Sequence, residues 1–595
     1  MTIRYAIRPA QPAAHIFHVT VTVAHADPAG QQFRLPAWIP GSYMIREFAR
    51  HVVRLTALSG DRKVAVRKLD KHTWRCAPVD GEVTVAYEVY AWDLSVRAAH
   101  LDATHGFFNG PSVFLQAVGR EEDDCRIDIL PPAGVRGWRV ATALRRARGT
   151  ATGSFGTYLA ANYDELIDCP VELGDFALGR FDVLGVPHEI AITGRVPRLD
   201  MPRLTSDLAR VCATQVRLFE PRRPLPPFDR YLFLTWAVDE GYGGLEHRNS
   251  TALLCQRSDL PHLGLGESTE GYRRFLGLAS HEYFHAWNVK RIRPAAFVPY
   301  DLARENHTRL LWVFEGFTSY YDDLALARAG LLTETQYLDT LAATLTTVTQ
   351  RSGRLKQTVG ESSFDAWIKY YRQDENAPNS VVSYYQKGAL VAAALDLSIR
   401  AESAGRRSLD DVMRLLWSRF KRAGAGYRGV GEDEIPALVE EATGLRMARA
   451  LREWSDGTRD PDFARLLAPL GVSVARRPAL DVPHFAWLGA STRRDGPDCR
   501  LASVHDGGPA QAAGLSAGDA LVAIDGLRAS AATLDRLLAR YRPGETVEIL
   551  AFRRDELMRF DVRLATLPPQ RFGFALSPTQ SAATRRMRKA WIGPR

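Results

Sequence analysis

The sequence predicts a multidomain α+β protein, because the type of segment changes twice along the chain. At 595 residues the chain is too long for one hydrophobic core, and a size of roughly 150 residues per domain suggests three or four units. Alternating strand patterns come first, helical patterns follow, and a short β-rich unit stands near the end. The boundaries we expect are a β-sheet domain over 1–168, a mixed domain over 169–395, a helical continuation over 396–471, a small β-rich domain over 472–568 and a basic tail over 569–595.

The N-terminal domain is predicted to be an antiparallel sheet with one buried face. In HIFHVTVTV apolar residues alternate with polar ones, and VTVAYEVYAW repeats the same period of two. The residues expected on the buried face are Phe17, Val19, Val21, Val23, Val83, Val85, Tyr87 and Val89. Between these strands, LPAWIPGSYMIREFARH has proline and glycine at positions 36, 40 and 41, which exclude a central strand there.

The middle of the chain is predicted to begin with a buried strand and to continue in helices. DRYLFLTWAV, residues 229–238, is an apolar run of strand length. LLWVFEGFTSYYDDLALARAG and KGALVAAALDLSIRAES show helical spacing and contain strong helix formers. The second half of this region therefore reads as almost entirely helical.

The small β-rich domain resembles a PDZ domain. Residues 507–530, GGPAQAAGLSAGDALVAIDGLRAS, are similar to the GL-x-x-GD-x-L-x-x-I-x-G core of that family, and the matching positions are Gly514, Leu515, Gly518, Asp519, Leu521, Ile524, Asp525 and Gly526. Such domains add an extended chain to a sheet edge and hold its terminal carboxylate in a loop of backbone N–H groups. The resemblance places this loop at WLGA, which comprises Trp487, Leu488, Gly489 and Ala490.

Composition and charge restrict the compartment and the partners. No stretch approaches the roughly 18 apolar residues of a membrane span, and Pro9 and Pro12 interrupt any signal-peptide core. The six cysteines are scattered, as in a reduced cytoplasmic protein. The net charge of +9 is spread along the chain and is densest in RRMRKAWIGPR, which we expect to be a frayed, solvated terminus rather than a nucleic-acid or lipid contact.

HEYFH, residues 281–285, sets two histidines four residues apart with a glutamate beside the first. On a helix, residues i and i+4 share one face, so His281 and His285 can bind one ion at about 2.0 to 2.1 Å. Glu282 can then reach a water molecule at that ion, which is the logic of the H-E-x-x-H peptidase motif. The spacing favours a zinc site, although a helix with two incidental histidines would have the same five letters.

A third ligand is expected at Glu315, in LLWVFEGFTSYYDD. A carboxylate in this apolar stretch is costly to bury unless a cation binds it, and a catalytic zinc site needs three protein ligands and one open position. Asp322 returns to the same helix face two turns later and is positioned to accept the distal N–H of a ligating histidine. The alternatives are a surface glutamate and a solvated aspartate.

Taken together, HEYFHAWNVKRIRP, WVFEGFTSYY, the upstream LPAWIPGSYMIREFARH and the PDZ-like unit resemble the glycyl aminopeptidase family of gluzincin zinc metallopeptidases. The likeness covers nearly the whole chain in order. It implies a thermolysin-like catalytic domain between the β-rich N-terminal domain and the PDZ domain. It also implies one Zn²⁺ per chain and peptide substrates with a free N-terminus.

Further site residues follow from the resemblance, position by position. DEGYGGLEHRNS is similar to the G-x-M-E-N segment of related aminopeptidases, which carries the amine-binding glutamate over to Glu246, with His247 where the relatives have asparagine. Gly243 and Gly244 would let a substrate backbone approach closely. VSYYQKGALV resembles the Y-x-K-G element, whose alignment on Lys387 selects Tyr385 as the donor to the oxyanion, with Tyr384 as the adjacent alternative. A structural loop glutamate and a packing tyrosine remain alternatives.

The leading hypothesis is a zinc-dependent aminopeptidase that removes small N-terminal residues, preferably Gly or Ala, by attack of a metal-activated water molecule. Glu282 would take the proton of this water and deliver it to the leaving amine. The preference for a small first side chain would follow if the nearby rings line the pocket, namely Tyr242, Phe317, Tyr320 and Tyr321. The alternatives are a gluzincin endopeptidase and a PDZ-based peptide-binding protein with a vestigial metal site. The oligomeric state, the PDZ ligand and a purely structural PDZ role stay open.

Overall fold

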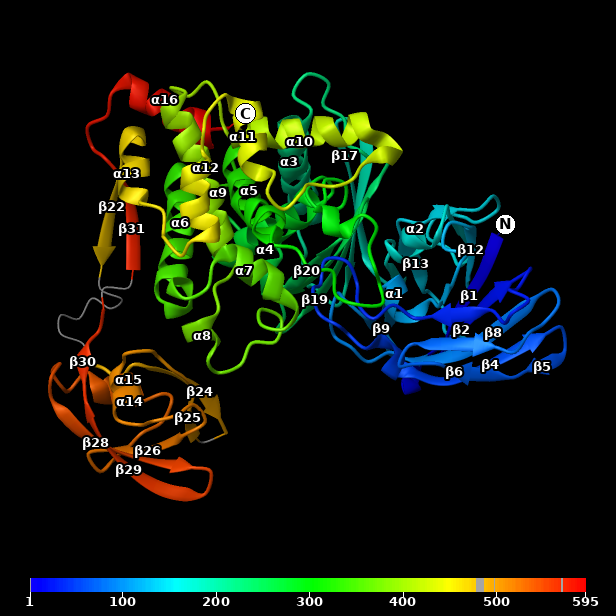
Figure 1. Ribbon diagram of the computed structural model, residues 1–595, viewed down its shortest axis with the longest axis horizontal. Helices are drawn as coiled ribbons and strands as arrows, with labels where there is room; N and C mark the ends of the chain where they lie inside the picture. Colours follow the sequence, from blue (N-terminus) through cyan, green and yellow to red (C-terminus); the bar gives the residue numbers. More distant parts are fainter. Residues whose placement is uncertain (1, 478–485, 497, 569–570, 595) are drawn as a thin grey trace.

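The computed structural model describes residues 2–477, 486–496, 498–568 and 571–594. Figure 1 shows three bodies: an N-terminal β domain, a central body of sheet and helices, and a small β domain below the central body. None of the helices in the described ranges combines the length and apolar character that crossing a membrane requires.

The N-terminal domain is built on an eight-stranded sheet with the order β14-β15-β12-β1-β2-β8-β4-β5. The predicted alternation is confirmed in β2 (Ile16–Val23) and β8 (Val83–Tyr90), where every residue expected on the buried face is buried. One pairing departs from the antiparallel expectation, because β1 (Thr2–Gln11) runs parallel to β12 (Asp124–Ile129). One edge of β1 pairs antiparallel with β2. The chain reaches the other edge of β1 with strand β12 only after a long crossover.

The N-terminal domain continues past the predicted boundary at residue 168. Strand β16 (Val171–Gly174) pairs with β10 (His105–Phe108) and β13 (Arg139–Thr142), so it completes a four-stranded sheet of the first domain. The central sheet starts after it, with β17 (Ala177–Val183).

The segment 35–51 lies between strands, as its prolines and glycines predict, and it docks on the central body. The Trp38 indole N–H donates to the Asp301 carbonyl at 2.9 Å, and the Ala37 N–H donates to the Leu302 carbonyl at 2.8 Å. Trp38 and Tyr43 are buried among side chains of the central core. This loop therefore brings residues of the first domain to the face of the second.

The central sheet has the order β17-β18-β19-β21-β20, and its last strand is an edge. The predicted buried strand is confirmed as β19 (Tyr231–Val238), which pairs in parallel with β18 (Val186–Thr193) and β21 (Ser250–Gln256). Edge strand β20 (Gly243–Glu246) pairs antiparallel with β21. Side chains on one face of this sheet belong to the core of the N-terminal domain, and those on the other face pack against helices.

The helical region forms one core rather than two. Helices α4 (Glu270–Phe284), α5 (Phe317–Arg328) and α9 (Gln386–Glu402) pack together, and the predicted boundary between residues 395 and 396 falls inside α9. Helices α10 (Leu409–Ala423), α11 (Ile435–Thr443) and α13 (Phe463–Leu467) contribute buried side chains to the same core. The helical continuation is thus a layer of the central body.

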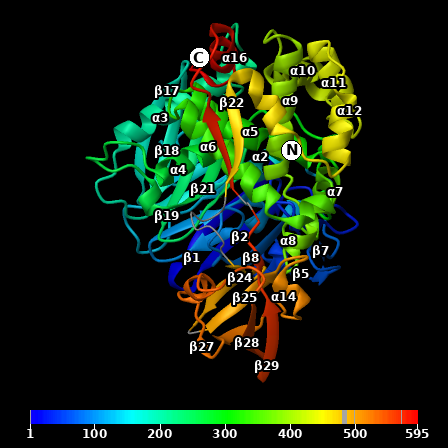
Figure 2. The same ribbon diagram turned by 90° about the vertical axis from the view of Figure 1, so that its left-hand side faces the viewer.

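The PDZ-like unit is an insertion, and the chain returns to the central body after it. Strand β22 (Val472–Arg477) pairs antiparallel with β31 (Arg571–Leu576), and these two strands form the ribbon above the small domain in Figures 1 and 2. Val472 and Phe574 belong to the central core, whereas the separate core of the small domain contains residues from 486 to 564. Residues 472–477 are therefore part of the central body, which corrects the predicted start of this domain.

The predicted basic tail is also corrected, because it is folded. Helix α16 (Ala582–Ile592) buries Trp591 completely against the central body, and the Trp591 indole N–H donates to the Tyr320 hydroxyl at 2.8 Å. Arg588 is buried and pairs with Glu334 at 2.8 Å. The prediction of a frayed terminus rested on the high charge density of RRMRKAWIGPR. Residues 585–592 of this segment instead belong to an amphipathic helix, and its buried residues are Arg588, Trp591 and Ile592.

Candidate active site

Helix α4 positions the first three candidate residues at its C-terminal end. The Thr269 side chain caps its N-terminus by accepting a hydrogen bond from the Tyr272 N–H at 3.1 Å. The last turn then presents His281 and Glu282, and His285 is the C-cap. The two imidazole planes are 83° apart with ring centroids separated by 4.7 Å, so both rings can aim an in-plane nitrogen at one point.

Glu315 completes a group of three potential metal ligands. It lies in η5 (Trp312–Gly316), a π-helical turn that leads into α5. Its Oε2 is 3.2 Å from His285 Nε2 and 3.6 Å from His281 Nε2. Three ligands about 2.1 Å from a tetrahedral ion are separated by roughly 3.4 Å from one another. The spacing of the donor atoms therefore fits a zinc ion.

The outer nitrogens of both histidines are held by fixed acceptors. His281 Nδ1 lies 3.0 Å from Asp322 Oδ2, and His285 Nδ1 lies 2.7 Å from the Asn288 carbonyl oxygen. Each contact leaves Nε2 free to ligate, which is the usual arrangement around protein-bound zinc. Burial alone would raise the pKa of Glu315, but the His285 and His281 imidazoles outweigh it and hold that pKa at about 2.

A second group of potential ligands, His100, Asp102 and His105, lies in the N-terminal domain. The two imidazole rings there are stacked, with planes only 28° apart. Because the nitrogen lone pairs lie in the ring planes, stacked rings do not converge on one ion. His105 Nδ1 instead contacts the buried Glu172 carboxylate at 3.0 Å. Of these two groups, only the one at residues 281, 285 and 315 has the geometry of a zinc site.

Glu282 is buried beside the proposed metal position. Its Oε2 has no hydrogen-bond partner among the described residues. Burial, opposed by the two histidines, raises the pKa of Glu282 to about 7. A Cβ atom on Gly244 would lie only 2.0 Å from Glu282 Oε1, so strand β20 passes directly against this carboxylate because position 244 is glycine.

Glu246 ends the edge strand β20 and is also buried, with 3% of its surface exposed. Its Oε1 has no hydrogen-bond partner within the described ranges. The neighbouring His247 turns toward Asp168, with Nδ1 3.2 Å from Oδ1. A buried carboxylate without a donor is costly, and a cationic ligand would compensate that cost.

The structure distinguishes the two adjacent tyrosines. The Tyr385 ring lies 6.2 Å from the His281 ring, and its hydroxyl is 3.2 Å from the Tyr371 hydroxyl. Tyr384 is completely buried in the central core. Burial, reinforced by the Glu315 charge, raises the pKa of Tyr385 well above 10, so this phenol stays protonated and can donate.

The rings expected to narrow the substrate pocket are placed differently. Phe317, Tyr320 and Tyr321 lie in the central core, and the two hydroxyls donate to Asp396 at 2.6 Å and to Asp410 at 2.9 Å. Tyr242 is more than half exposed and lies under the Arg274 guanidinium. These four residues are therefore not a ring of pocket walls, because helix packing and buried aspartates engage three of them.

Three residues near the site were not predicted as site residues. The Tyr43 hydroxyl donates to Glu315 Oε1 at 3.1 Å, and a Cβ atom on Gly41 would lie 2.4 Å from a Glu246 oxygen. Tyr371 comes from the loop before α8 (Ala377–Ser380) and donates weakly to the Gly41 carbonyl at 3.5 Å. The motif GSY within the quoted LPAWIPGSYMIREFARH segment was the available signal, but nothing in its spacing indicated a contact with residues 246 and 315.

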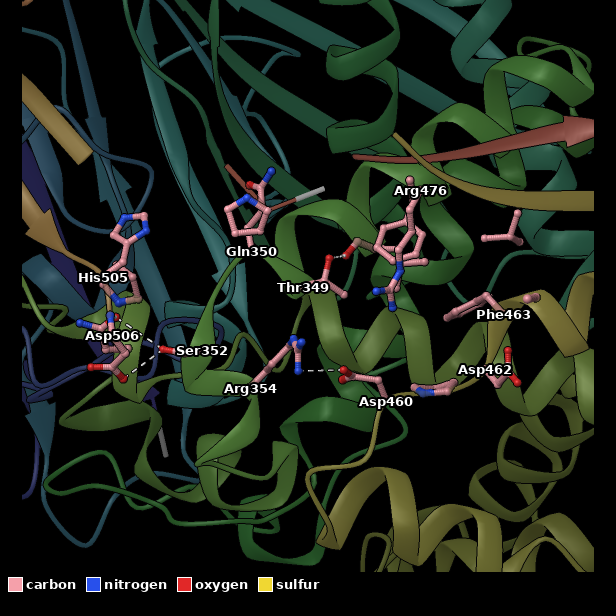
Figure 3. Close-up of a pocket in the computed structure, with 18 of the residues that line it drawn as sticks. Thr349, Gln350, Ser352, Arg354, Asp460, Asp462, Phe463, Arg476, His505 and Asp506 are labelled. Atoms are coloured by element: carbon pink, nitrogen blue, oxygen red, sulfur yellow. Dashed lines mark hydrogen bonds and ion pairs between the residues drawn. The ribbon is translucent and has the colours of Figure 1, made fainter. Parts of the chain in front are cut away.

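A hollow of about 550 Å³ lies between the PDZ-like unit and the central body (Figure 3), and the proposed metal ligands are not among the residues that line it. Trp487 and His505 line it from the small domain, and Arg354 and Asp460, 2.9 Å apart, line it from the central body. The two bodies are joined here by Asn379, whose amide nitrogen donates to the Val504 carbonyl at 2.7 Å, and by the ion pair of Lys356 with Asp506. Trp487 of the proposed carboxylate loop thus borders this hollow.

The fold and this group of side chains define a metallo-aminopeptidase. Family models match residues 4–175 (Peptidase M61 N-terminal domain), 274–391 (M61 glycyl aminopeptidase) and 486–564 (PDZ domain). The crystal structure of an aminopeptidase N family protein from Idiomarina loihiensis is 39% identical in sequence, covers 100% of both chains and superimposes with a TM-score of 0.94. The chain belongs to the M61 glycyl aminopeptidase family.

More distant likenesses were also found. The M1 zinc metallopeptidase of Deinococcus radiodurans is 15% identical, with 78% of this chain and 95% of that chain covered and a TM-score of 0.49. Yeast LTA4 hydrolase in complex with bestatin is 12% identical, with 79% and 69% covered and a TM-score of 0.46. A search of curated protein sequences gave no match.

Proposed function

We propose that this aminopeptidase uses one zinc ion, bound by His281, His285 and Glu315, to remove small N-terminal residues from peptides, with Gly and Ala preferred. The observation that carries the proposal is the buried Glu246 carboxylate at the end of an edge strand beside the three potential ligands, whose Oε1 has no hydrogen-bond donor among the described residues. A free edge can pair with a substrate backbone, and an unpaired carboxylate can bind its ammonium group.

The roles of the side chains follow from their positions. A zinc ion at this site would polarise the scissile carbonyl and acidify a water molecule. Glu282, whose pKa is raised to about 7, accepts the proton of the attacking water and hands it to the leaving nitrogen. Tyr385 donates a hydrogen bond to the oxygen that gains negative charge. Asp322 orients His281 through its Nδ1.

The preference for a small first residue is supported by crowding around the amine site. Glu246 lies against the Gly41 backbone, and the Tyr43 and Tyr385 side chains stand close to the neighbouring Glu315. A large first side chain would have to displace one of these buried groups. Rates on Gly, Ala, Leu and Arg amide substrates test this, and a faster reaction with Leu than with Ala would contradict it.

Blocking the substrate amine decides between an aminopeptidase and an endopeptidase. An ammonium group gains a charge-assisted hydrogen bond from Glu246, whereas an acetylated amine leaves that carboxylate unpaired. We expect N-acetyl-Ala-Ala-Ala to be cleaved at least about a hundredfold more slowly than Ala-Ala-Ala. Equal rates would remove Glu246 from amine recognition and favour an endopeptidase.

For the PDZ domain we propose binding of a C-terminal peptide at Trp487, Leu488, Gly489 and Ala490. Gly489 adopts a positive φ of 79° and approaches Gly508 closely, and this geometry shapes the loop. Titration with a short peptide acid and with its C-terminal amide tests the proposal. Equal affinity for the two peptides would leave the domain with a structural role.

A further inference from the structure

Arg97 of the N-terminal domain lies beside the open edge of strand β20, and Arg46 of the same domain lies near enough to Arg97 for their charges to interact. Arg97 belongs to the turn before β9 (Ala99–Leu101), and its two terminal guanidinium nitrogens lie 3.6 and 3.8 Å from the point that a Cβ atom on Gly243 would occupy. Arg46 comes from the docked loop, and its Nε donates to the Ser42 hydroxyl at 3.2 Å. The guanidinium group of Arg97 thus covers the backbone at the end of β20 opposite to Glu246.

Neither arginine is neutralised by an ion pair in the described part of the chain. Arg97 Nε is buried and lacks a hydrogen-bond partner there. Burial, followed by the charge of Arg97, lowers the pKa of Arg46 to about 10. Arg46 and Arg97 are half-buried, whereas the fully buried cations of the described ranges have carboxylate partners within ion-pair distance, such as Lys290 with Asp168 at 2.7 Å. Arg46 has the Ser42 hydroxyl as an acceptor, and the charge of Asp93 acts on it, but no carboxylate forms an ion pair with either arginine among the described residues. Two neighbouring guanidinium groups in this state point to an anionic ligand.

The position of Arg97 corresponds to a definite point on a bound peptide. If Glu246 holds the amine and Glu282 stands beside the scissile bond, a substrate on the free edge of β20 runs from Glu246 toward Gly243. Gly244, between these ends, passes directly against Glu282. Three strand residues span about 10 Å, which is also the length of an extended tripeptide. The group that reaches Arg97 is therefore the end of a peptide of two or three residues.

We infer that Arg97, with Arg46 beside it, binds the terminal carboxylate of di- and tripeptide substrates, so that the enzyme recognises both ends of a very short peptide. This inference rests on the proposed function of the same site. It divides recognition between two domains, because the central body supplies the amine site and the N-terminal domain supplies the carboxylate site. A guanidinium group suits this role, since its planar N–H fork matches both carboxylate oxygens.

The test compares Ala-Ala-Ala with its C-terminal amide in the full-length, metal-loaded enzyme. We expect kcat/KM to be at least about tenfold higher for the free acid, as for one charge-assisted hydrogen bond. In Arg97→Gln this ratio should fall to near one, mainly through KM, and Arg97→Lys should retain part of it. Arg54→Gln is the matched control, because Arg54 is an exposed arginine on β4 (Val52–Ser59) of the same domain, and it should keep the wild-type ratio.

Two results would overturn the inference: equal kcat/KM for acid and amide in the wild-type enzyme, or equal losses for both substrates in Arg97→Gln. If Arg97→Gln does not fold, the wild-type ratio and Arg46→Gln decide the question. Failure of the proposed function would give a different result. In that case, N-acetylation would not slow the cleavage of either the acid or the amide. If the acid and the amide are cleaved equally fast and both reactions require a free N-terminal amine, only the proposed carboxylate site is rejected.

Discussion

Gly41 and Glu246 are in direct contact, although they come from different domains. A Cβ atom on Gly41 would lie 2.4 Å from one Glu246 carboxylate oxygen, and Gly41 has a φ of 95° that other residues rarely adopt. The proposed amine site is therefore shaped by the docked loop of the N-terminal domain as well as by strand β20. The first domain is a structural part of the site.

Gly41→Ala should impair catalysis by displacing Glu246. We expect kcat/KM on an Ala-peptide to fall by about a hundredfold, because a shift of about 1 Å in a positioning group can have that effect. Gly60→Ala is the control, since Gly60 also has a positive φ of 56° but a Cβ atom there would touch nothing within 4 Å. Both variants carry backbone strain, so a similar loss of activity in both would disprove the specific role of Gly41.

Metal content should depend on the three proposed ligands. We expect about one zinc per chain by elemental analysis. His285→Gln should lose both the metal and the activity, because a catalytic zinc site needs three protein ligands and only two would remain. His105→Gln tests the stacked histidine group and should leave the metal content unchanged. Retention of zinc by His285→Gln, or its loss from His105→Gln, would show that the ion is bound elsewhere.

Glu282→Gln should separate metal binding from proton transfer. The amide keeps the shape of the side chain but cannot accept the proton, so kcat should fall by about a hundredfold to ten-thousandfold. Zinc content should stay at the wild-type value, since Glu282 is not a proposed ligand. An unchanged kcat would remove Glu282 from the mechanism, whereas a wild-type protein that binds peptides without hydrolysing them would favour the PDZ-based binding protein with a vestigial site.

The two adjacent tyrosines provide a matched pair of variants. Tyr385→Phe should lower kcat by about a hundredfold to a thousandfold, because a single donor to the oxyanion is worth about 2.7 to 4 kcal/mol. Tyr384→Phe removes a hydroxyl that is buried without a hydrogen-bond partner among the described residues, so kcat should change little and stability should not fall. If Tyr384→Phe has the larger effect on kcat, the assignment is reversed.

Local sequence patterns were enough to predict several strands and helices of the first two domains. Strands β2 and β8 alternate between buried and more exposed residues, β19 is a buried apolar run, and α5 and α9 are helices, as their sequences indicate. The spacing of His281 and His285 predicted their convergence, because both residues lie on one helical segment. Glu315 needed a further argument, namely the cost of burying a carboxylate among apolar residues.

Long-range contacts could not be predicted in this way. Gly41, Tyr43 and Arg97 reach the site from irregular segments, where no period indicates direction. The ribbon of β22 and β31 pairs residues on opposite sides of the PDZ domain, and a local motif for that domain gave no sign that the chain returns. Helix α16 was not predicted, because its high charge indicated a solvated terminus. Its buried Trp591 and Arg588 nevertheless contact Tyr320 and Glu334.

The contact between the first two domains should lose stability at low pH, because the Asp168 carboxylate that contributes to it becomes protonated. This carboxylate lies at the end of α2 (Tyr163–Ile167), is buried, and contacts Lys290 Nζ at 2.7 Å and the Arg248 N–H at 3.0 Å. Burial alone would raise the pKa of Asp168, but Lys290 and Arg248 outweigh it and hold that pKa well below 3.8. A carboxyl group with a depressed folded-state pKa stabilises the fold above its unfolded pKa of about 3.9, and this contribution is lost as the pH falls further.

Asp168→Asn should therefore lower the free energy of unfolding by about 3 to 5 kcal/mol at pH 7, because it leaves Lys290 buried without a charge partner. The difference from the wild type should stay constant down to about pH 5 and then shrink, with a slope that approaches about 1.4 kcal/mol per pH unit below the unfolded pKa of about 3.9, since the wild-type carboxyl group becomes protonated in the unfolded state. Denaturant titrations between pH 3 and pH 7 measure this. Asp164→Asn removes a half-exposed partner of Arg248 and should lose no more than about 1 kcal/mol. A difference between wild type and Asp168→Asn that did not shrink below pH 4 would mean that packing, rather than the charge of Asp168, holds the two domains together.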